Sequence, residues 1–416
     1  MRLIISFAAL FLSVIFLQLT SGSLGPLDAL SGLQEGFTKT QVGLLGSAHF
    51  AGFFVGCWVA PRLMGSAGHL RAFAAFAAIG AIGAVAHPIW VDALGWSLLR
   101  VMTGLSISGC YTVVEAWLQA KVTNDTRGRV LGVYRVVDMG ASLVAQLMIG
   151  FLEPASYVSY NIITILCIAS LLPLMLTTAR APVATGSPRL RPLEAMRLSP
   201  LAAAGVVAAG VSSPAFRMVG PVYGQDVGLR ADQIGFFLAA GVLGGALAQF
   251  PVGWLADKLD RRKVLIGLSM AAAAVCAGTV FLTGAPQSAI FAASFLFGAT
   301  TFPIFSVSAA HANDFASAEG VVELNASLLF IYGIGAIASP LVASILVENL
   351  GPAALFGFVG VVHAGLAALG AARMLVRPTS PERTPYAYVP RTSFLLGRLL
   401  RRRNGSATHK GRDAAH

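Results

Sequence analysis

The sequence predicts an all-α integral membrane protein with twelve transmembrane helices in two pseudo-symmetric six-helix bundles. The chain of 416 residues is 56% hydrophobic and 11% charged, with a mean hydropathy of +0.75, whereas soluble domains carry about 25% charged residues. Its 45 glycines suit closely packed membrane helices, because small residues let neighbouring backbones approach. The apolar runs are long and unbroken, which argues against the shorter alternating segments of a β-barrel.

Twelve apolar stretches are long enough to cross a membrane, since about 20 helical residues span about 30 Å of hydrocarbon. They fall into two groups of six. The predicted spans are 4–24, 42–64, 72–91, 94–118, 130–151 and 157–177 in the first group, and 200–221, 232–255, 264–283, 288–310, 324–347 and 353–374 in the second.

Lysine and arginine are distributed unevenly between the two sides of the predicted bundle. One side carries nearly all the loop cations, whereas the other has only Lys39 and Arg230. Because cytoplasmic loops hold an excess of Lys and Arg, we expect both termini in the cytoplasm and the protein in a bacterial inner membrane. Cations in loops beside the bilayer also account for the net charge of +11 without a nucleic-acid partner.

The two halves of the chain resemble each other at a constant offset. The stretch "GPLDALSGLQEGF" from Gly25 resembles "GPVYGQDVGLRADQIGFF" from Gly220, and Gly140 in span five matches Gly335 in span eleven. A duplication of this kind is typical of transporter folds.

The sequence between and after the two groups of spans predicts the domain organisation. It consists of a first bundle over 1–178, a cytoplasmic linker over 179–198, a second bundle over 199–374 and a basic, disordered cytoplasmic tail over 375–416. Within the tail, "SFLLGRLLRRR" could instead form a short amphipathic helix on anionic lipid headgroups.

The stretch "GWLADKLDRRKVL" combines a glycine, an aspartate and a basic cluster between the eighth and ninth spans. It resembles the loop motif of the major facilitator superfamily, whose twelve spans, duplicated halves and central linker also match residues 1–374. The resemblance implies that Asp257 and Arg261 latch a cytoplasmic gate, with Asp314 as a candidate partner. Gly253 and Arg262 complete the motif. A plain positive-inside loop would explain the cations but not the aspartate.

The corresponding loop after span two has Pro61 where the aspartate should be. A symmetric pair of latches is therefore not expected, and closure of the first half must use other contacts.

Span four resembles the family's second motif through Arg100 and Gly104, and Glu115 lies on the same helix face. In that family the arginine is tied to proton-coupled transport, so the resemblance implies coupling here. The alternative role of Arg100 is hydrogen bonding between helices.

Span five places Arg135, Asp138 and Gln146 on one polar stripe. A charge near the centre of a membrane helix costs about 2.5 to 3.5 kcal/mol. Two charged side chains on one helix stripe therefore indicate an aqueous cavity or a buried ion pair. The pattern leaves open whether these charges pair with each other, with span four or with a solute.

Three further polar residues are candidates for the solute site. Arg217 either contacts the solute or extends towards the membrane surface, and Asn325 and Tyr332 either line the cavity or form hydrogen bonds between helices.

These features together favour a secondary transporter that moves a small solute by alternating access. A proton gradient is the expected driving force, with Asp138 or Glu115 as carriers. Efflux of a drug or metabolite by proton antiport is the alternative. An integral-membrane enzyme is disfavoured because the sequence has no HExxH or GxSxG motif. We expect no cofactor and no metal, a lipid bilayer around the protein, and a monomer.

Overall fold

The computed structural model describes residues 2–123, 126–176, 188–282, 284–317, 320–376, 384, 386–389 and 391–395, with side chains from Phe7 onward. Within these residues every regular element is a helix. The first half of the chain forms α1 (Arg2–Gln34), α2 (Lys39–Ala67), α3 (His69–Val85), α4 (Ala93–Lys121), α5 (Arg127–Leu147), the 3₁₀ helix η1 (Met148–Gly150), α6 (Tyr157–Ala169) and α7 (Leu172–Met175).

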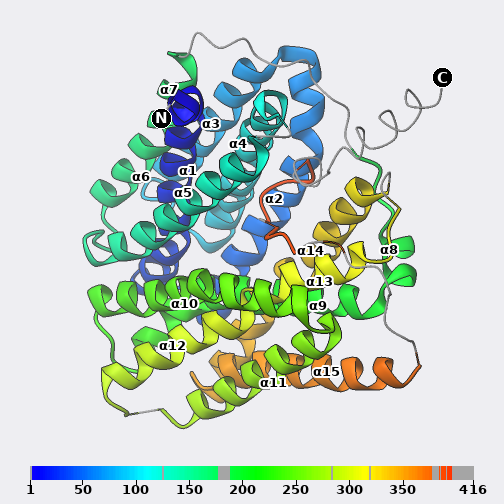
Figure 1. The fold of residues 1–416 in the computed structure, drawn as a ribbon. Coiled ribbons are helices and arrows are strands. Elements are labelled where there is room, and N and C mark those ends of the chain that lie inside the picture. The colour runs from blue at the N-terminus through cyan, green and yellow to red at the C-terminus, as the bar shows by residue number, and fades with distance from the viewer. Residues whose placement is uncertain are drawn as a thin grey trace, which may run out of the picture.

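The second half repeats this pattern after a short linker helix. Its helices are α8 (Pro192–Leu198), α9 (Pro200–Asp226), α10 (Ala231–Lys258), α11 (Arg261–Val280), α12 (Gln287–Thr301), α13 (Ile304–Asn313), α14 (Val321–Leu350) and α15 (Ala354–Val376). In Figure 1 the blue-to-teal helices of the first half and the green-to-orange helices of the second form two separate bundles.

Eleven segments in the described part of the chain are long and apolar enough to cross a membrane. The third predicted span is the exception, because α3 is a shorter apolar helix of 17 residues. The tenth span is broken between α12 and α13 at Pro303, which cannot donate a backbone hydrogen bond. The helical membrane fold is thus confirmed, with α3 as the short member of the twelve predicted helices.

Glycines set the closest helix contacts in equivalent places of the two halves. A Cβ on Gly104 of α4 would lie 2.0 Å from the carbonyl oxygen of His49 on α2. A Cβ on Gly298 of α12 would lie 1.8 Å from the carbonyl oxygen of Gly241 on α10. Both positions therefore need glycine for the backbones to meet. The second and fourth spans of each half pack in the same way, as expected for a duplication.

The two halves meet at the end of the bundle where α2 begins, which we call the Lys39 end. Lys39 Nζ lies 2.5 Å from Asp226 Oδ2, and the Thr40 backbone N–H donates to Glu348 Oε2 at 2.7 Å. A Cβ on Gly43 would overlap Ser344, so α2 and α14 touch at backbone distance here. The opposite end of the bundle, where α11 begins, we call the Arg261 end.

Part of the predicted linker and part of the predicted tail pack against the bundles. In the linker, the Arg191 backbone N–H donates to Ser327 Oγ of α14 at 2.8 Å. The described tail residues lie between the two halves at the Arg261 end, shown in red beside α2 and α14 in Figure 1. This position differs from the disordered tail that the composition predicted. Residues 377–383, 385, 390 and 396–416 lie outside the described residues, and the domain boundaries stay a prediction.

Candidate functional site

A polar cavity lies between the two halves, about midway along their central helices. Its volume is about 140 Å³. Helices α1, α2, α4 and α5 line it from the first half, and α9 and α14 from the second. Its lining residues are Gln18, Ser21, His49, Phe50, Phe53, Ile107, Tyr111, Asp138, Ser213, Arg217 and Tyr332, with Tyr388, Arg391 and Thr392 from the tail.

Asp138 of α5 is the carboxylate of this cavity. The Tyr111 hydroxyl lies 3.0 Å from Asp138 Oδ1 and 2.7 Å from Gln18 Oε1. A hydroxyl has one proton to donate. It can turn towards an ionised Asp138, or donate to Gln18 and accept from a protonated Asp138. The same three side chains can therefore satisfy both protonation states of the carboxylate.

Arg217 of α9 is the cation that the second half contributes to the cavity. Its Nη2 donates to Ser142 Oγ of α5 at 3.1 Å, so the guanidinium reaches across from one half to the other. The alternative prediction, in which Arg217 extends to the membrane surface, is wrong, because the side chain lines the central cavity. Asp138 and Arg217 thus face one cavity from opposite halves.

Arg135 and Glu115 lie closer to the Arg261 end and contact the tail. The Arg135 guanidinium lies 4.2 Å from the ring centroid of Tyr388, and no described ion pair joins Arg135 to Asp138 three residues later. Glu115 is 1% exposed and accepts hydrogen bonds from Tyr134 at 3.2 Å and from the hydroxyls of Thr392 and Ser393. Neither side chain lines the cavity.

Arg100 lies in a second buried polar cluster, nearer the Lys39 end. Its Nη1 is 3.2 Å from Asp28 Oδ2, and Asp28 is fully buried. The other oxygen of Asp28 accepts from the Tyr160 hydroxyl at 2.9 Å, and His87 Nε2 lies 3.5 Å from Oδ2. Asp28 is not among the residues predicted from the sequence, because the predicted first span ends at residue 24, whereas α1 continues to Gln34.

Gln146 and Asn325 form hydrogen bonds between helices, whereas Tyr332 lines the cavity as Arg217 does. Gln146 donates to the Gly22 carbonyl of α1 at 3.0 Å. Asn325 donates to Asn313 Oδ1 of α13 at 3.1 Å. Tyr332 lines the cavity and packs edge-on against Phe305, with ring centroids 5.5 Å apart.

The predicted gate motif forms a buried network at the Arg261 end. Arg261 is 2% exposed, and its guanidinium pairs with Asp314 at 2.5 Å and with Asp257 at 3.5 Å. It also donates to the Ala310 carbonyl at 2.7 Å, which ties α11 to α13. Arg262 pairs with Asp260 beside it at 2.7 Å, so it belongs to the cap of α11.

Gly253 of the motif lies directly under a tail side chain. A Cβ at this position would be 2.7 Å from the Tyr386 ring. The Tyr386 hydroxyl donates to Gln249 Oε1 at 2.7 Å, and its backbone N–H donates to Asp257 Oδ1 at 2.7 Å. Burial raises the pKa of the Tyr386 phenol, so this hydroxyl stays protonated as a donor. The motif therefore holds the tail as well as linking its own helices.

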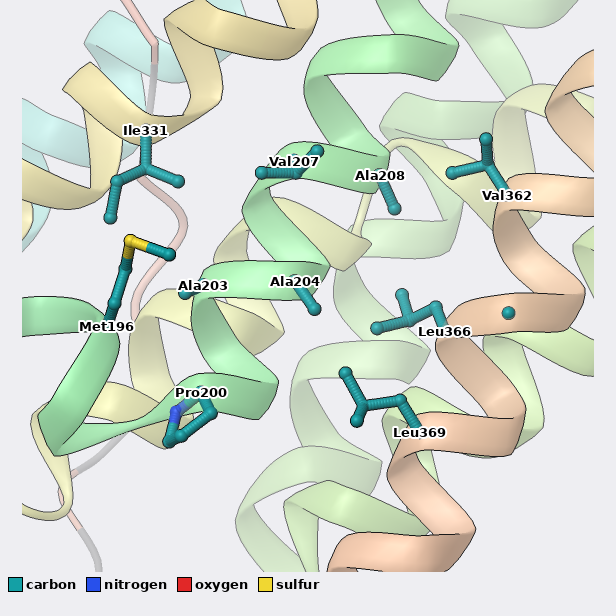
Figure 2. Close-up of a pocket in the computed structure, with 11 residues that line it drawn as sticks. Met196, Pro200, Ala203, Ala204, Val207, Ala208, Ile331, Val362, Leu366 and Leu369 are labelled. Atoms are coloured by element: carbon teal, nitrogen blue, oxygen red, sulfur yellow. The ribbon is translucent and has the colours of Figure 1, made fainter.

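A further hollow of about 320 Å³ lies outside the interface between the halves. Figure 2 shows it between α9, α15 and the linker helix α8, with Val207, Leu366 and Met196 among the residues around it. Its lining is aliphatic, so it offers no charge or hydrogen bond to a polar solute.

Comparison with known proteins agrees with this fold. The family model described as Major Facilitator Superfamily matches residues 201–406. An MFS-type transporter of Yersinia pestis (strain Pestoides F) is 27% identical over 351 residues, which are 84% of this chain and 89% of the relative. An MFS-type transporter of Enterobacter sp. (strain 638) is 27% identical over 380 residues, covering 90% of this chain and 96% of the relative.

Solved transporters have the same fold at low sequence identity. The nucleoside transporter NupG superposes with a TM-score of 0.73 at 14% identity, over 89% of this chain and 99% of that one. The next neighbour is a bacterial homologue of the human lysosomal transporter Spinster, in an inward-facing and occupied conformation. It superposes with a TM-score of 0.72 at 15% identity, over 91% of this chain and 99% of that one. The D-xylose-proton symporter superposes with a TM-score of 0.67 at 14% identity, over 91% of this chain and 99% of that one.

Two helical bundles with a polar cavity between them define a multi-pass membrane transporter, and the relatives are named as transporters rather than enzymes. The resemblance to the major facilitator superfamily therefore extends over most of the chain.

Proposed function

We propose that this protein moves a small polar solute by alternating access and couples the movement to protons through Asp138. The observation that carries the proposal is the placement of Asp138 and Arg217 on one cavity, each from a different half. A charge pair that spans the halves responds to any movement of one half against the other, because Coulomb interactions in a low-dielectric interior change steeply with distance.

Arg217 and Asp138 also suggest the chemical class of the solute. An ionised Asp138 neutralises the guanidinium, whereas a protonated Asp138 leaves it free to bind an anionic group, and guanidinium groups recognise carboxylate and phosphate well. We infer that the solute carries an anionic group and that proton uptake by Asp138 favours its binding. The other titratable or charged side chains on the cavity are His49, Tyr111, Tyr332, Tyr388 and Arg391.

Contacts at the Lys39 end support an assignment of the conformation. Lys39 with Asp226 and Thr40 with Glu348 join the halves there, and the positive-inside rule assigns this end to the outside. The conformation is then inward-facing, with the Arg261 end towards the cytoplasm. Neighbours of this fold include a nucleoside transporter and a D-xylose-proton symporter, which is compatible with a small polar solute and with protons.

A ligand screen by thermal shift tests this proposal. Purified protein is heated with a library of anionic, neutral and cationic metabolites at one pH below and one above neutrality. We expect small anions to stabilise the protein, more strongly at the lower pH, because protonated Asp138 no longer competes for Arg217. A ligand at 100 times its Kd adds about 2.7 kcal/mol to the unfolding free energy.

Arg217→Ala should lose this response to anions. The matched control is Arg230→Ala, which removes an arginine from the exposed loop at the Lys39 end and should leave the response unchanged. Stabilisation by cations alone, or an unchanged response of Arg217→Ala, would reject the assigned site.

A further inference from the structure

The described tail residues between Thr384 and Leu395, here called the C-terminal segment, lie across the opening between the halves at the Arg261 end. We propose that this segment is an intramolecular plug, which closes the cavity from that end and must leave before solute can enter or exit there. The inference rests on the proposed function for its consequence, because a plug matters only if solute passes through this opening.

The segment is bound to the second half through the gate motif. The Thr384 backbone N–H and hydroxyl both donate to Asp314 Oδ1, at 2.8 and 3.0 Å, and the Thr384 carbonyl accepts from Arg261. Asp257 accepts the Tyr386 backbone N–H at 2.7 Å. Hydrogen bonds to charged groups are stronger than neutral ones. The ion-pair network of the motif therefore also serves as the anchor of the segment.

The same segment is bound to the first half through Glu115. This buried carboxylate accepts the hydroxyls of Thr392 and Ser393, with Tyr134 as its third partner. A buried carboxylate is unfavourable unless hydrogen bonds satisfy it. Docking of the segment supplies two of the three hydrogen bonds, so Glu115 selects a segment that offers hydroxyl groups at this position.

Apolar side chains of the segment are buried between the halves. Phe394 and Leu395 are 3% and 1% exposed, and Val389 is 6% exposed. The Phe394 ring lies 6.1 Å from that of Phe54 on α2, and the Val389 backbone N–H donates to Ser306 Oγ on α13 at 3.2 Å. The segment therefore contacts both bundles and links them.

The middle of the segment reaches the solute site itself. Tyr388, Arg391 and Thr392 line the cavity, and the Arg391 guanidinium lies 5.4 Å from the ring centroid of Tyr332. With the segment in place the cavity measures about 140 Å³, below the roughly 300 Å³ at which ligand pockets usually begin. A solute at Asp138 and Arg217 would compete with Arg391 for the same space, so seating of the plug and entry of solute from this end exclude each other.

The test measures access to the cavity and needs no solute. The four native cysteines are replaced by alanine, and Ser21→Cys on the cavity wall serves as the reporter for N-ethylmaleimide in detergent. Thr392→Asp with Ser393→Asp places two carboxylates against Glu115. We expect this variant to label at least tenfold faster, because both hydrogen bonds to Glu115 are lost and each hydrogen bond to a charged group shifts the docking equilibrium by about tenfold or more.

Matched variants separate docking from a general effect of charge. Ser406→Asp with Thr408→Asp adds the same charges further along the tail and should label at the rate of the full chain. A chain ending at Val376 should label as fast as the first variant, and a synthetic peptide of residues 384–395 should slow it again.

Equal labelling rates in the full chain, the Thr392→Asp with Ser393→Asp variant and the shortened chain would overturn the plug. If the shortened chain does not fold, the full-length variant still decides the matter. Equal labelling rates would leave the proposed transport function unaffected, because the labelling assay does not measure transport. Conversely, a faster labelling rate would still support the plug if no anion stabilised the protein in the ligand screen.

Discussion

Asp138→Asn is expected to abolish proton-driven accumulation while leaving exchange of solute across the membrane. Asparagine keeps the size and the hydrogen bond to Tyr111 but holds no transferable proton, so it imitates the protonated carboxyl. A gradient of one pH unit stores about 1.4 kcal/mol per proton, enough for about a tenfold concentration ratio of a solute coupled one to one. The variant should bring that ratio to about one. Proteoliposomes loaded with the anion found in the stability screen provide the measurement.

Glu115→Gln is the matched control for this prediction. Glu115 is the other carboxylate that the sequence suggested as a proton carrier, but it contacts Tyr134 and the C-terminal segment instead of the cavity. We therefore expect Glu115→Gln to keep the accumulation. If Asp138→Asn still accumulates solute and Glu115→Gln does not, the carrier is Glu115 and the assignment to Asp138 is wrong.

Arg100→Ala is expected to destabilise the protein strongly. Arg100 is 3% exposed and pairs with the fully buried Asp28, so truncation leaves a buried carboxylate without its cation. Breaking a buried pair from one side costs about 3 to 5 kcal/mol. Thermal or denaturant unfolding in detergent micelles measures the loss.

The double variant Asp28→Leu with Arg100→Met shows whether the loss comes from the unpaired charge. Removing both charged groups leaves neither unsatisfied, so the double variant should be more stable than Arg100→Ala. A double variant that is as unstable as the single one would mean that packing around Tyr160 and His87, rather than the ion pair, explains the loss. Retained proton coupling in the double variant would further support Asp138 as the carrier.

The sequence predicted the helical membrane fold well because the signals that define it are local. Long apolar runs fix each span by its own composition, and the glycines that bring α2 against α4 recur in α10 and α12 through the duplication. Asp138, Arg217 and Tyr332 were found because a polar residue inside an apolar run stands out without knowledge of its neighbours. Their meeting on one cavity depends on how the halves pack, which the sequence pattern does not contain.

Other features of the site depend on contacts between distant segments, and local pattern could not reveal them. Asp28 lies in a stretch that reads as a loop after the first span, and its role depends on Arg100, 72 positions later in the sequence. Arg135 was grouped with Asp138 on a stripe of α5, yet its ring contact is with Tyr388, far along the chain. The tail reads as disordered by composition, although its hydroxyl and apolar side chains match groups on both bundles.

The most direct test of the central claim is a cross-link between the halves at the Lys39 end. A Cβ on Gly150 of η1 would lie 3.3 Å from the Asp232 Cβ of α10, close to the roughly 3.5 to 4.5 Å of disulfides. Gly150→Cys with Asp232→Cys is oxidised in proteoliposomes, and each single cysteine is the control. If solute crosses by separation of the halves at this end, transport stops in the oxidised double variant and returns on reduction. Full transport through the oxidised, cross-linked protein would contradict the account.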